Sequence, residues 1–431
     1  MLNKIEYTTD LAEKFQSRKA KVSKEVTQAV EQIIENIREN GDKALFEYAE
    51  KFDGFKANAE NLTVTQAEFN AGLAQIDADY LRILRRAKTQ IEEFHQHQLG
   101  NSWGIYKENG VIMGQIVRPL ERVALYVPGG TAAYPSTVIM NAVPALLAGV
   151  KNLFIITPVK SDGKVNPNIL AAAEVCGIKT IYKVGGAQAV AAAAYGTASI
   201  PKADKIVGPG NIFVATAKKL CYGTVDIDMI AGPSEVLVIA DEAANPKYVA
   251  ADLMAQAEHD KLASAILVTS SDTLVSAVNQ ELERQVVQLE REEIIRSSIS
   301  NYGGAIVVST LAEAFDVSNQ LAPEHLEVLT AEPLAKLPLI KNAGSIFLGE
   351  YTPEPLGDYM SGTNHVLPTG GTAKFYSGLG VYDFIKYSSY SYYPRDILAI
   401  FKDDVMAFAK SEGLTGHANS IGVRFDEEDN K

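Results

Sequence analysis

The sequence has 431 residues, of which 47% are hydrophobic and 22% charged, a globular composition whose length predicts two or three domains. The formal net charge is -13 and no basic stripe is present, so nucleic acid and anionic membrane are not expected partners. Only two cysteines occur, which excludes a disulfide framework and favours a cytoplasmic protein. The first residues lack a signal peptide's apolar core, and Pro144, Gly149 and Lys151 interrupt the most apolar stretch, so we expect no membrane span.

The N-terminal region begins with a polar stretch, residues 1–24, that we expect to form a loosely attached arm. A helix is predicted next, with Ser23 as its N-cap and Gly41 as its C-terminal end. Its apolar residues recur at helical spacing, at Val26, Val30, Ile33, Ile34 and Ile37. Residues 42–120 predict mixed helices and short strands, without a motif that indicates a function.

From residue 121 strands alternate with helices, which is typical of parallel sheets with helical crossovers. Strands are predicted at 122–127, 152–157, 180–184 and 235–240, within an α/β domain at about 125–235. A second α/β unit follows, with helices at 246–259 and 272–298, and short strands at 265–270, 305–309, 325–330 and 345–349. An aromatic segment and a helix at 397–412 end the chain. The two similar halves indicate a duplicated architecture.

Three glycine-rich turns lie between predicted strands and helices of the domain at 125–235. They are Pro128-Gly129-Gly130, Gly185-Gly186 and Gly208-Pro209-Gly210-Asn211. Such turns direct backbone N–H groups to a helix start, where phosphate binds well, and parallel strands bring them to one edge of the sheet. No GxGxxG fingerprint is present, so an ordinary Rossmann cofactor site is not indicated. The alternative is that these are tight packing turns.

Four of the six histidines have suggestive neighbours, and for three of them these neighbours indicate a metal site. Gln256 and His259 are three residues apart on a predicted helix, and imidazole nitrogen and carboxylate oxygen are good zinc ligands. Further candidates stand in two glycine-containing loops, Asp358 with His365 and Glu412 with His417. The QAEH spacing alone is a weak signal. His95 and His97 lie in a polar helix, where we expect a solvated surface.

Pro323-Glu324-His325 is the candidate acid/base pair. A histidine with a pKa near 6.5 is suited to take an alcohol proton, and a neighbouring carboxylate can activate water. Adjacent strand residues point to opposite faces, so both serve one site only if the backbone is irregular there. The alternative is a strand-entry turn with surface charges. Cys176 and Cys221 are expected to be buried in helices, which leaves thioester chemistry a minor alternative.

Taken together, the motifs resemble the histidinol dehydrogenase family over roughly residues 25–420. The matching segments are YVPGGTAAYPS, KVGGAQA, VGPGN, AGPSEVLVIAD, ADLMAQAEHD, LAPEHLEVLT, GDYMSGTNHVLPTGGTAKF and EGLTGHA, in this order. Lys374 stands where arginine is more usual, and Met360 where a smaller residue is more usual. Neither has a proposed catalytic role.

The resemblance implies a zinc-dependent, four-electron oxidation of L-histidinol through the aldehyde to L-histidine, with reduction of two NAD. It implies zinc ligands at Gln256, His259, Asp358 and His417. Glu324 and His325 match the acid/base pair and also touch the substrate, as do the zinc ligands. The other matched positions are substrate contacts at Ser234, His365 and Glu412, and NAD contacts at Tyr126, Gln188 and Asn211.

The implied fold is α/β, with two Rossmann-like, incomplete and duplicated parallel-sheet domains and small helical N- and C-terminal segments. The expected parts are an arm (1–24), a first α/β domain with the metal and acid/base residues (25–124 and 236–380), a second α/β domain with the NAD turns (125–235) and a C-terminal segment (381–431). The resemblance also implies a homodimer whose C-terminal segment crosses to the partner subunit. A zinc hydrolase and a non-catalytic metal-binding protein are the rival functions.

Overall fold

The computed structural model describes residues 1–7, 24–129, 134–230 and 232–426. Ser23, Gly130 and most of the predicted N-terminal arm lie outside these ranges. The chain divides into two compact units, one made of residues 1–99 and 120–384 and the other of residues 100–119 and 385–431. Among the described residues, no helix has the length and apolar character needed to cross a membrane.

The first sheet of the larger unit has five parallel strands in the order β5-β4-β3-β6-β7. They are β3 (Arg122–Tyr126), β4 (Asn152–Thr157), β5 (Ile181–Lys183), β6 (Lys205–Val207) and β7 (Asp226–Ile227). Along β3, Val123 and Leu125 pack on one face of the sheet while Ala124 and Tyr126 pack on the other. This alternation buries both faces, as a parallel sheet between two helical layers requires.

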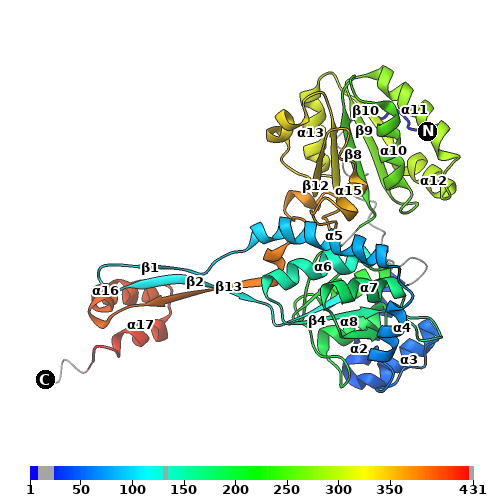
Figure 1. The fold of residues 1–431 in the computed structure, drawn as a ribbon. Helices are drawn as coiled ribbons and strands as arrows, with labels where there is room; N and C mark the ends of the chain where they lie inside the picture. Colours follow the sequence, from blue (N-terminus) through cyan, green and yellow to red (C-terminus); the bar gives the residue numbers. More distant parts are fainter. Residues whose placement is uncertain (8–23, 130–133, 231, 427–431) are drawn as a thin grey trace. The chain divides into compact units, whose positions relative to one another are not determined.

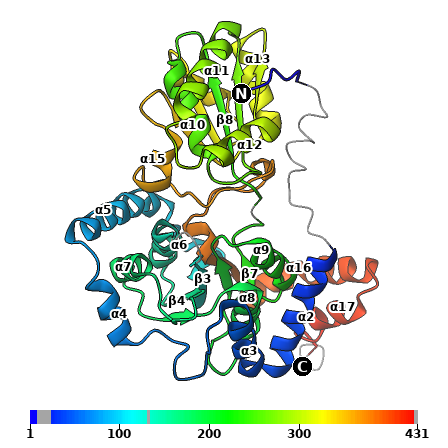
Figure 2. The ribbon, with the colours of Figure 1, turned by 90° about the vertical axis from the view of Figure 1, so that its right-hand side faces the viewer.

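Helices cover both faces of this sheet. One face packs against α4 (Gln66–Leu73), α5 (Ala78–His95), α6 (Pro135–Ala148) and α7 (Pro167–Cys176). The other packs against α2 (Lys24–Asn40), α3 (Asp42–Asp53), α8 (Gly186–Tyr195) and α9 (Ile212–Cys221). Figure 2 shows α2 and α3 beside α8. A short 3-10 helix, η1 (Gln96–Gln98), extends α5.

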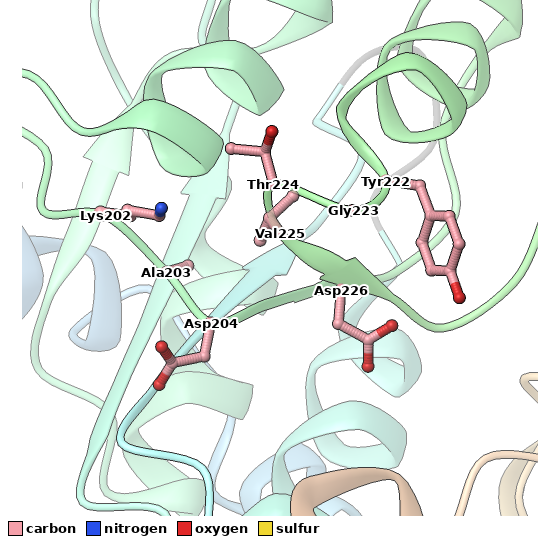
Figure 3. A pocket seen from close by; sticks show the side chains of 8 residues that line it. All are labelled: Lys202, Ala203, Asp204, Tyr222, Gly223, Thr224, Val225 and Asp226. Atoms are coloured by element: carbon pink, nitrogen blue, oxygen red, sulfur yellow. The ribbon is translucent and has the colours of Figure 1, made fainter. Parts of the chain in front are cut away.

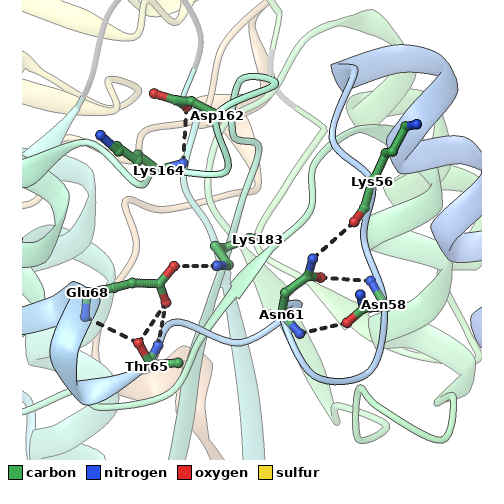
Figure 4. Close-up of polar contacts among 8 residues, drawn as sticks. All are labelled: Lys56, Asn58, Asn61, Thr65, Glu68, Asp162, Lys164 and Lys183. Atoms are coloured by element: carbon green, nitrogen blue, oxygen red, sulfur yellow. Dashed lines mark hydrogen bonds and ion pairs between the residues drawn. The ribbon is translucent and has the colours of Figure 1, made fainter.

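Residues 24–95 therefore pack with the first sheet, whereas we expected 25–124 to join residues 236–380. The apolar face of α2 joins the cluster around the alanine-rich α8. A side-chain contact adds to this, since Lys183 at the end of β5 pairs with Glu68 at 2.7 Å. Glu68 and Thr65 form the capping box of α4, and Figure 4 shows the three residues together.

The second sheet also has five parallel strands, in the order β10-β9-β8-β11-β12. They are β8 (Glu235–Ala240), β9 (Ser264–Thr269), β10 (Gly304–Val307), β11 (His325–Leu329) and β12 (Ser345–Leu348). One face packs against α10 (Pro246–Ala257), α11 (Asp272–Val286) and α12 (Glu292–Tyr302), and the other against α13 (Leu311–Leu321), as Figure 1 shows. The single helix expected at 272–298 is thus two helices, separated by a turn at 287–291.

The two sheets share one strand order. Numbered along the chain within each sheet, both run third, second, first, fourth, fifth. This is the Rossmann order without its sixth strand, so the expected pair of incomplete, duplicated Rossmann-like sheets is confirmed. Shorter elements follow β11: α14 (Pro333–Lys336), η2 (Leu337–Leu339), α15 (Glu354–Tyr359), η3 (Thr372–Lys374) and η4 (Val381–Phe384).

The smaller unit combines two separate segments of the chain. It contains β1 (Trp103–Tyr106), β2 (Ile112–Pro119), β13 (Ile385–Tyr392), α16 (Arg395–Ser411) and α17 (Thr415–Gly422). β2 pairs antiparallel with both β1 and β13. We expected the C-terminal segment to be helical only. Its aromatic stretch instead forms the strand β13, which precedes the two helices. Residues 381–384 belong to the larger unit.

The first residues of the chain add to the edge of the second sheet. Ala305 of β10 donates its N–H to the Asn3 carbonyl, and Ile5 donates its N–H to the Ala305 carbonyl, both at 2.9 Å. Leu2 is buried with the α10–α12 layer and Ile5 packs against the α13 layer. These residues are held more firmly than the loose attachment that we expected for the arm.

Candidate active site

Glu324 and His325 lie together at the start of β11. Ala322 follows α13 in the left-handed conformation, with φ 51°. No other non-glycine residue in the described ranges has a positive φ. Glu324 precedes the strand and His325 opens it, and both are buried. Their carboxylate and imidazole are 3.6 Å apart. The irregular backbone that we required for both side chains to serve one site is therefore present.

Backbone groups of Glu235, on the neighbouring β8, hold both side chains. The Glu324 carboxylate accepts the Glu235 N–H at 2.9 Å, and His325 Nδ1 lies 2.9 Å from the Glu235 carbonyl oxygen. A carbonyl only accepts, so Nδ1 carries the proton and Nε2 presents its lone pair. Burial lowers the pKa of His325 to about 4, which keeps the imidazole neutral near pH 7. His325 Nε2 can therefore accept a proton.

Burial raises the pKa of Glu324 well above its ordinary value, and the nearby Glu235 carboxylate adds to this. A carboxylate with a raised pKa is a stronger base once it is ionised. This acid/base pair lies at the amino edge of its sheet, whereas ligands of open α/β sheets usually bind at the carboxyl edge.

A second cluster has the geometry of a metal site. One ligand atom from each of His259, Glu354 and Asp358 lies within 4.8 Å of the others. We expected His259 to lie on the same helix as Gln256. It lies just after α10 instead, because the helix ends at Ala257. Glu354 and Asp358 are four residues apart on α15, which places them on one face. Asp358 Oδ1 is 3.8 Å from His365 Nδ1.

Unpartnered buried polar atoms occur on Glu354 of the cluster and on Gln256, which is three residues before His259 in the sequence. Gln256 is 0% exposed, and neither its oxygen nor its nitrogen has a hydrogen-bond partner there; the same holds for Glu354 Oε1. Burial is the main cause that raises the pKa of Glu354 to about 8 and of Asp358 to about 6. Unsatisfied buried atoms and crowded carboxyl groups are costly unless a ligand or cation meets them. Imidazole and carboxylate donors fit zinc.

The cluster also joins the acid/base pair. Glu354 Oε1 is 3.8 Å from His325 Nε2. We did not predict Glu354 from the sequence, although its four-residue spacing to Asp358 was a signal. Ser234 directly precedes β8, and its carbonyl accepts the Ser264 N–H at 3.0 Å. His365 is partly buried, with its side chain 14% exposed, and desolvation lowers its pKa to about 4.

Two of the expected site residues belong to the smaller unit. Glu412 follows α16 and His417 lies on α17. The other candidate metal, acid/base and substrate residues lie in the second-sheet part of the larger unit.

The three expected NAD contacts lie at the carboxyl edge of the first sheet. Tyr126 ends β3, and its buried hydroxyl accepts the Gly186 N–H at 3.0 Å. Burial raises the pKa of this hydroxyl to about 12, so it stays protonated. Gln188 is buried on the first turn of α8, and its Nε2 has no hydrogen-bond partner within the described ranges. Asn211 caps α9 by accepting the N–H groups of Phe213 and Val214.

Of the two pockets described here, one contains no candidate site residue and the other borders the metal cluster. Figure 3 shows a pocket of about 400 Å³ around β7 that contains none of the candidates; Gly223 and Asp226 are among its lining residues. Another cavity, of about 380 Å³, adjoins Asp358 and is lined mainly by apolar side chains of α5 and α6. The second cavity therefore borders the metal cluster.

The remaining histidine and cysteine expectations had mixed outcomes. His97 is exposed as expected, but His95 is fully buried, where its Nδ1 lies 2.8 Å from Gln98 Oε1. Cys176 and Cys221 are buried in helices as expected, and burial raises both thiol pKa values to about 12. Neither thiol is a competent nucleophile near neutral pH.

Two parallel Rossmann-like sheets, with polar turns at one edge and a buried histidine–carboxylate site, define an α/β enzyme. Comparison with known proteins identifies its family. The family model for histidinol dehydrogenase matches residues 16–425. The histidinol dehydrogenase of Lactococcus lactis is 78% identical over 99% of this chain and 100% of its own length. That of Clostridium acetobutylicum is 57% identical over 95% of this chain and 94% of its own.

The fold agrees with this result. A crystal structure of histidinol dehydrogenase from Elizabethkingia anophelis has a TM-score of 0.92, is 36% identical and covers 99% of both chains. The chain belongs to the histidinol dehydrogenase family. It is therefore an oxidoreductase of histidine biosynthesis, in the family whose reaction is the oxidation of histidinol.

Proposed function

We propose that this protein carries out the zinc-dependent, four-electron oxidation of L-histidinol through the aldehyde to L-histidine, with reduction of two NAD in succession. The observation that carries this proposal is the buried Glu324–His325 pair beside the cluster of His259, Glu354 and Asp358. Histidinol offers an imidazole and an amine, which are both good zinc ligands. A metal there would anchor the substrate beside groups that move protons.

Gln256, His259 and Asp358 would hold the zinc together with His417. Bound zinc supplies a Lewis-acidic anchor for the amino alcohol, and NAD supplies the hydride acceptor. His325 Nε2 accepts the hydroxyl proton in each hydride-transfer step, because Nδ1 is already committed to the Glu235 carbonyl. Glu324 accepts a proton from the water that adds to the aldehyde. Ser234 and His365 contact the substrate.

The NAD site is proposed at the carboxyl edge of the first sheet. Tyr126, Gln188 and Asn211 come from the β3–α6, β5–α8 and β6–α9 connections, which all lie at this edge. The unpartnered Gln188 Nε2 supports a ligand there, because a buried donor without a partner is costly. The parts we propose are accordingly an NAD-binding first-sheet region and a catalytic second-sheet region.

We also propose a homodimer in which Glu412 and His417 complete the site of the partner subunit. The apolar side chains of α16 support this, since Ile400 and Phe408 are each 70% exposed. Exposed apolar residues grouped on one helix are typical of a surface that packs against another chain. Two free, buried cysteines are consistent with a reducing, cytoplasmic location.

A coupled assay tests the proposal. L-histidinol and NAD are supplied with and without a zinc chelator, and NADH and L-histidine are both counted. We expect two NADH for each histidine and loss of the reaction with chelator. One NADH for each histidine would rule out the four-electron reaction, and turnover without NAD would favour a zinc hydrolase.

A further inference from the structure

A buried ion pair lies behind the turn that follows β6. Lys218 is on α9, Asp228 directly follows β7, and their side chains are 6% and 2% exposed. The Lys218 ammonium donates to the Asp228 carboxylate and, at 2.9 Å, to the Gly208 carbonyl oxygen. A buried ion pair adds little net stability, because both charges lose their hydration. We therefore ask which backbone groups the ion pair holds in place, because its own contribution to stability is small.

Both backbone polar groups of Gly208 are bound by this pair. The Gly208 N–H donates to Asp228 Oδ2 at 2.7 Å, while the carbonyl accepts from Lys218. Gly208 has φ +113°, which L side chains rarely adopt, and a Cβ there would lie 2.1 Å from the Tyr126 carbonyl oxygen. The pair thus fixes a glycine-only conformation that packs directly on Tyr126.

We propose that Lys218 and Asp228 are positioning residues for NAD, which hold the turn 208–211 in the shape that presents Tyr126 and Asn211 to the cofactor. This inference rests on the NAD site proposed above. The Gly208 N–H is already donated to Asp228, so it does not bind a phosphate. The Asn211 side-chain oxygen is engaged in the α9 cap, so its amino group is the part that meets the cofactor.

Asp228 also binds the backbone of the residue that follows it, at the start of the connection from β7 to β8. Its Oδ1 accepts the N–H of Met229 at 2.7 Å. Met229 begins the connection that leads to Ser234 and β8. One carboxylate therefore fixes both the turn 208–211 and the start of the connection from β7 to β8.

The test measures NAD binding to the zinc-loaded, full-length protein by isothermal titration calorimetry, with L-histidinol binding as the second readout. Lys218→Met removes the ammonium and leaves Asp228 unpaired. The double variant Lys218→Met/Asp228→Asn removes both charges and keeps an acceptor for the Gly208 N–H, which protects against failure to fold. We expect roughly a tenfold or larger increase in the NAD Kd for both, with the L-histidinol Kd changed by less than about twofold.

Lys205→Met is the matched control. Lys205 is a buried lysine at the opposite, amino end of β6, where it pairs with Asp226 and donates to the Asp383 carbonyl. We expect this variant to lose stability but to retain the wild-type NAD Kd. Unchanged NAD binding in both Lys218 variants would overturn the proposal. So would an equal loss for NAD and L-histidinol, or an equal loss in the control. Failure of the wild-type protein itself to bind NAD would instead remove the proposed cofactor, and this role with it.

Discussion

Replacing Gly208 by alanine tests the turn after β6 with a single added methyl group. Two costs follow from its geometry. The φ of +113° is a conformation that costs an L-residue ~1–3 kcal/mol. The new Cβ would lie 2.1 Å from the Tyr126 carbonyl oxygen, and backbone displaced by such a contact costs a further ~1–3 kcal/mol. We therefore expect Gly208→Ala to lower the free energy of unfolding by ~2–6 kcal/mol.

Gly223→Ala separates the two costs. Gly223 has a similar φ of +95°, but a Cβ there would meet nothing within 4 Å. Its substitution should cost only the backbone part, ~1–3 kcal/mol. The two variants should therefore differ by ~1–3 kcal/mol. Urea unfolding followed by far-ultraviolet circular dichroism gives this difference, and calorimetry gives the NAD Kd.

The binding result is the more decisive one. Only Gly208→Ala should weaken NAD binding, because only that methyl group forces the turn away from Tyr126. If both variants unfold at the same urea midpoint and bind NAD equally, the close packing of the turn on Tyr126 does not have the role that we assign to it.

Three other substitutions test the acid/base pair, the metal cluster and a buried carboxyl group. Glu324→Gln should keep an acceptor for the Glu235 N–H and spare the first hydride transfer, while histidine formation from the aldehyde slows by ~10²-fold or more; a wild-type rate from supplied aldehyde would refute the role of Glu324. Glu354→Gln should weaken zinc binding by ~10–100-fold in a chelator competition, whereas equal affinity would place Glu354 outside the metal's surroundings. Burial raises the pKa of Asp53 from 3.8 to about 6, so the folded state binds a proton on this carboxyl group more tightly than the unfolded state does. The stability that this protonated carboxyl group contributes is fully present below pH 3.8 and is lost as the pH rises through about 6. Asp53→Asn should therefore be more stable than wild type by ~1–2 kcal/mol at about pH 8 but not at about pH 4, as compared by thermal unfolding.

The sheets could be predicted because their strands are short apolar runs bounded by turns. The strand expected at 152–157 is β4 itself, and the one at 235–240 is β8. The packing of α2 could not be predicted in this way, because an amphipathic face shows that a helix is buried but not against which sheet. The same limit explains why residues 24–95 were grouped with the wrong sheet.

We proposed candidate site residues where a motif concentrated them, and we overlooked candidates where only spacing carried the signal. Glu324 and His325 are adjacent in sequence, but the left-handed conformation of Ala322 before them could not be predicted, because alanine rarely adopts it. Two signals were present and unused. Glu354 is one helical turn from Asp358, and His95 continues the buried face of Leu84, Ala87 and Ile91.

The pairing of residue 3 with residue 305 has a consequence for the order of events during synthesis. Asn3 is synthesised about 300 residues before its hydrogen-bond partner Ala305. At roughly 5–20 residues per second, the N-terminus waits on the order of 15–60 s for its docking strand. Once docked, it occupies the free edge of β10, the kind of edge that otherwise recruits strands from other chains. Residues 3–5 can therefore cover this edge only after Ala305 has been synthesised.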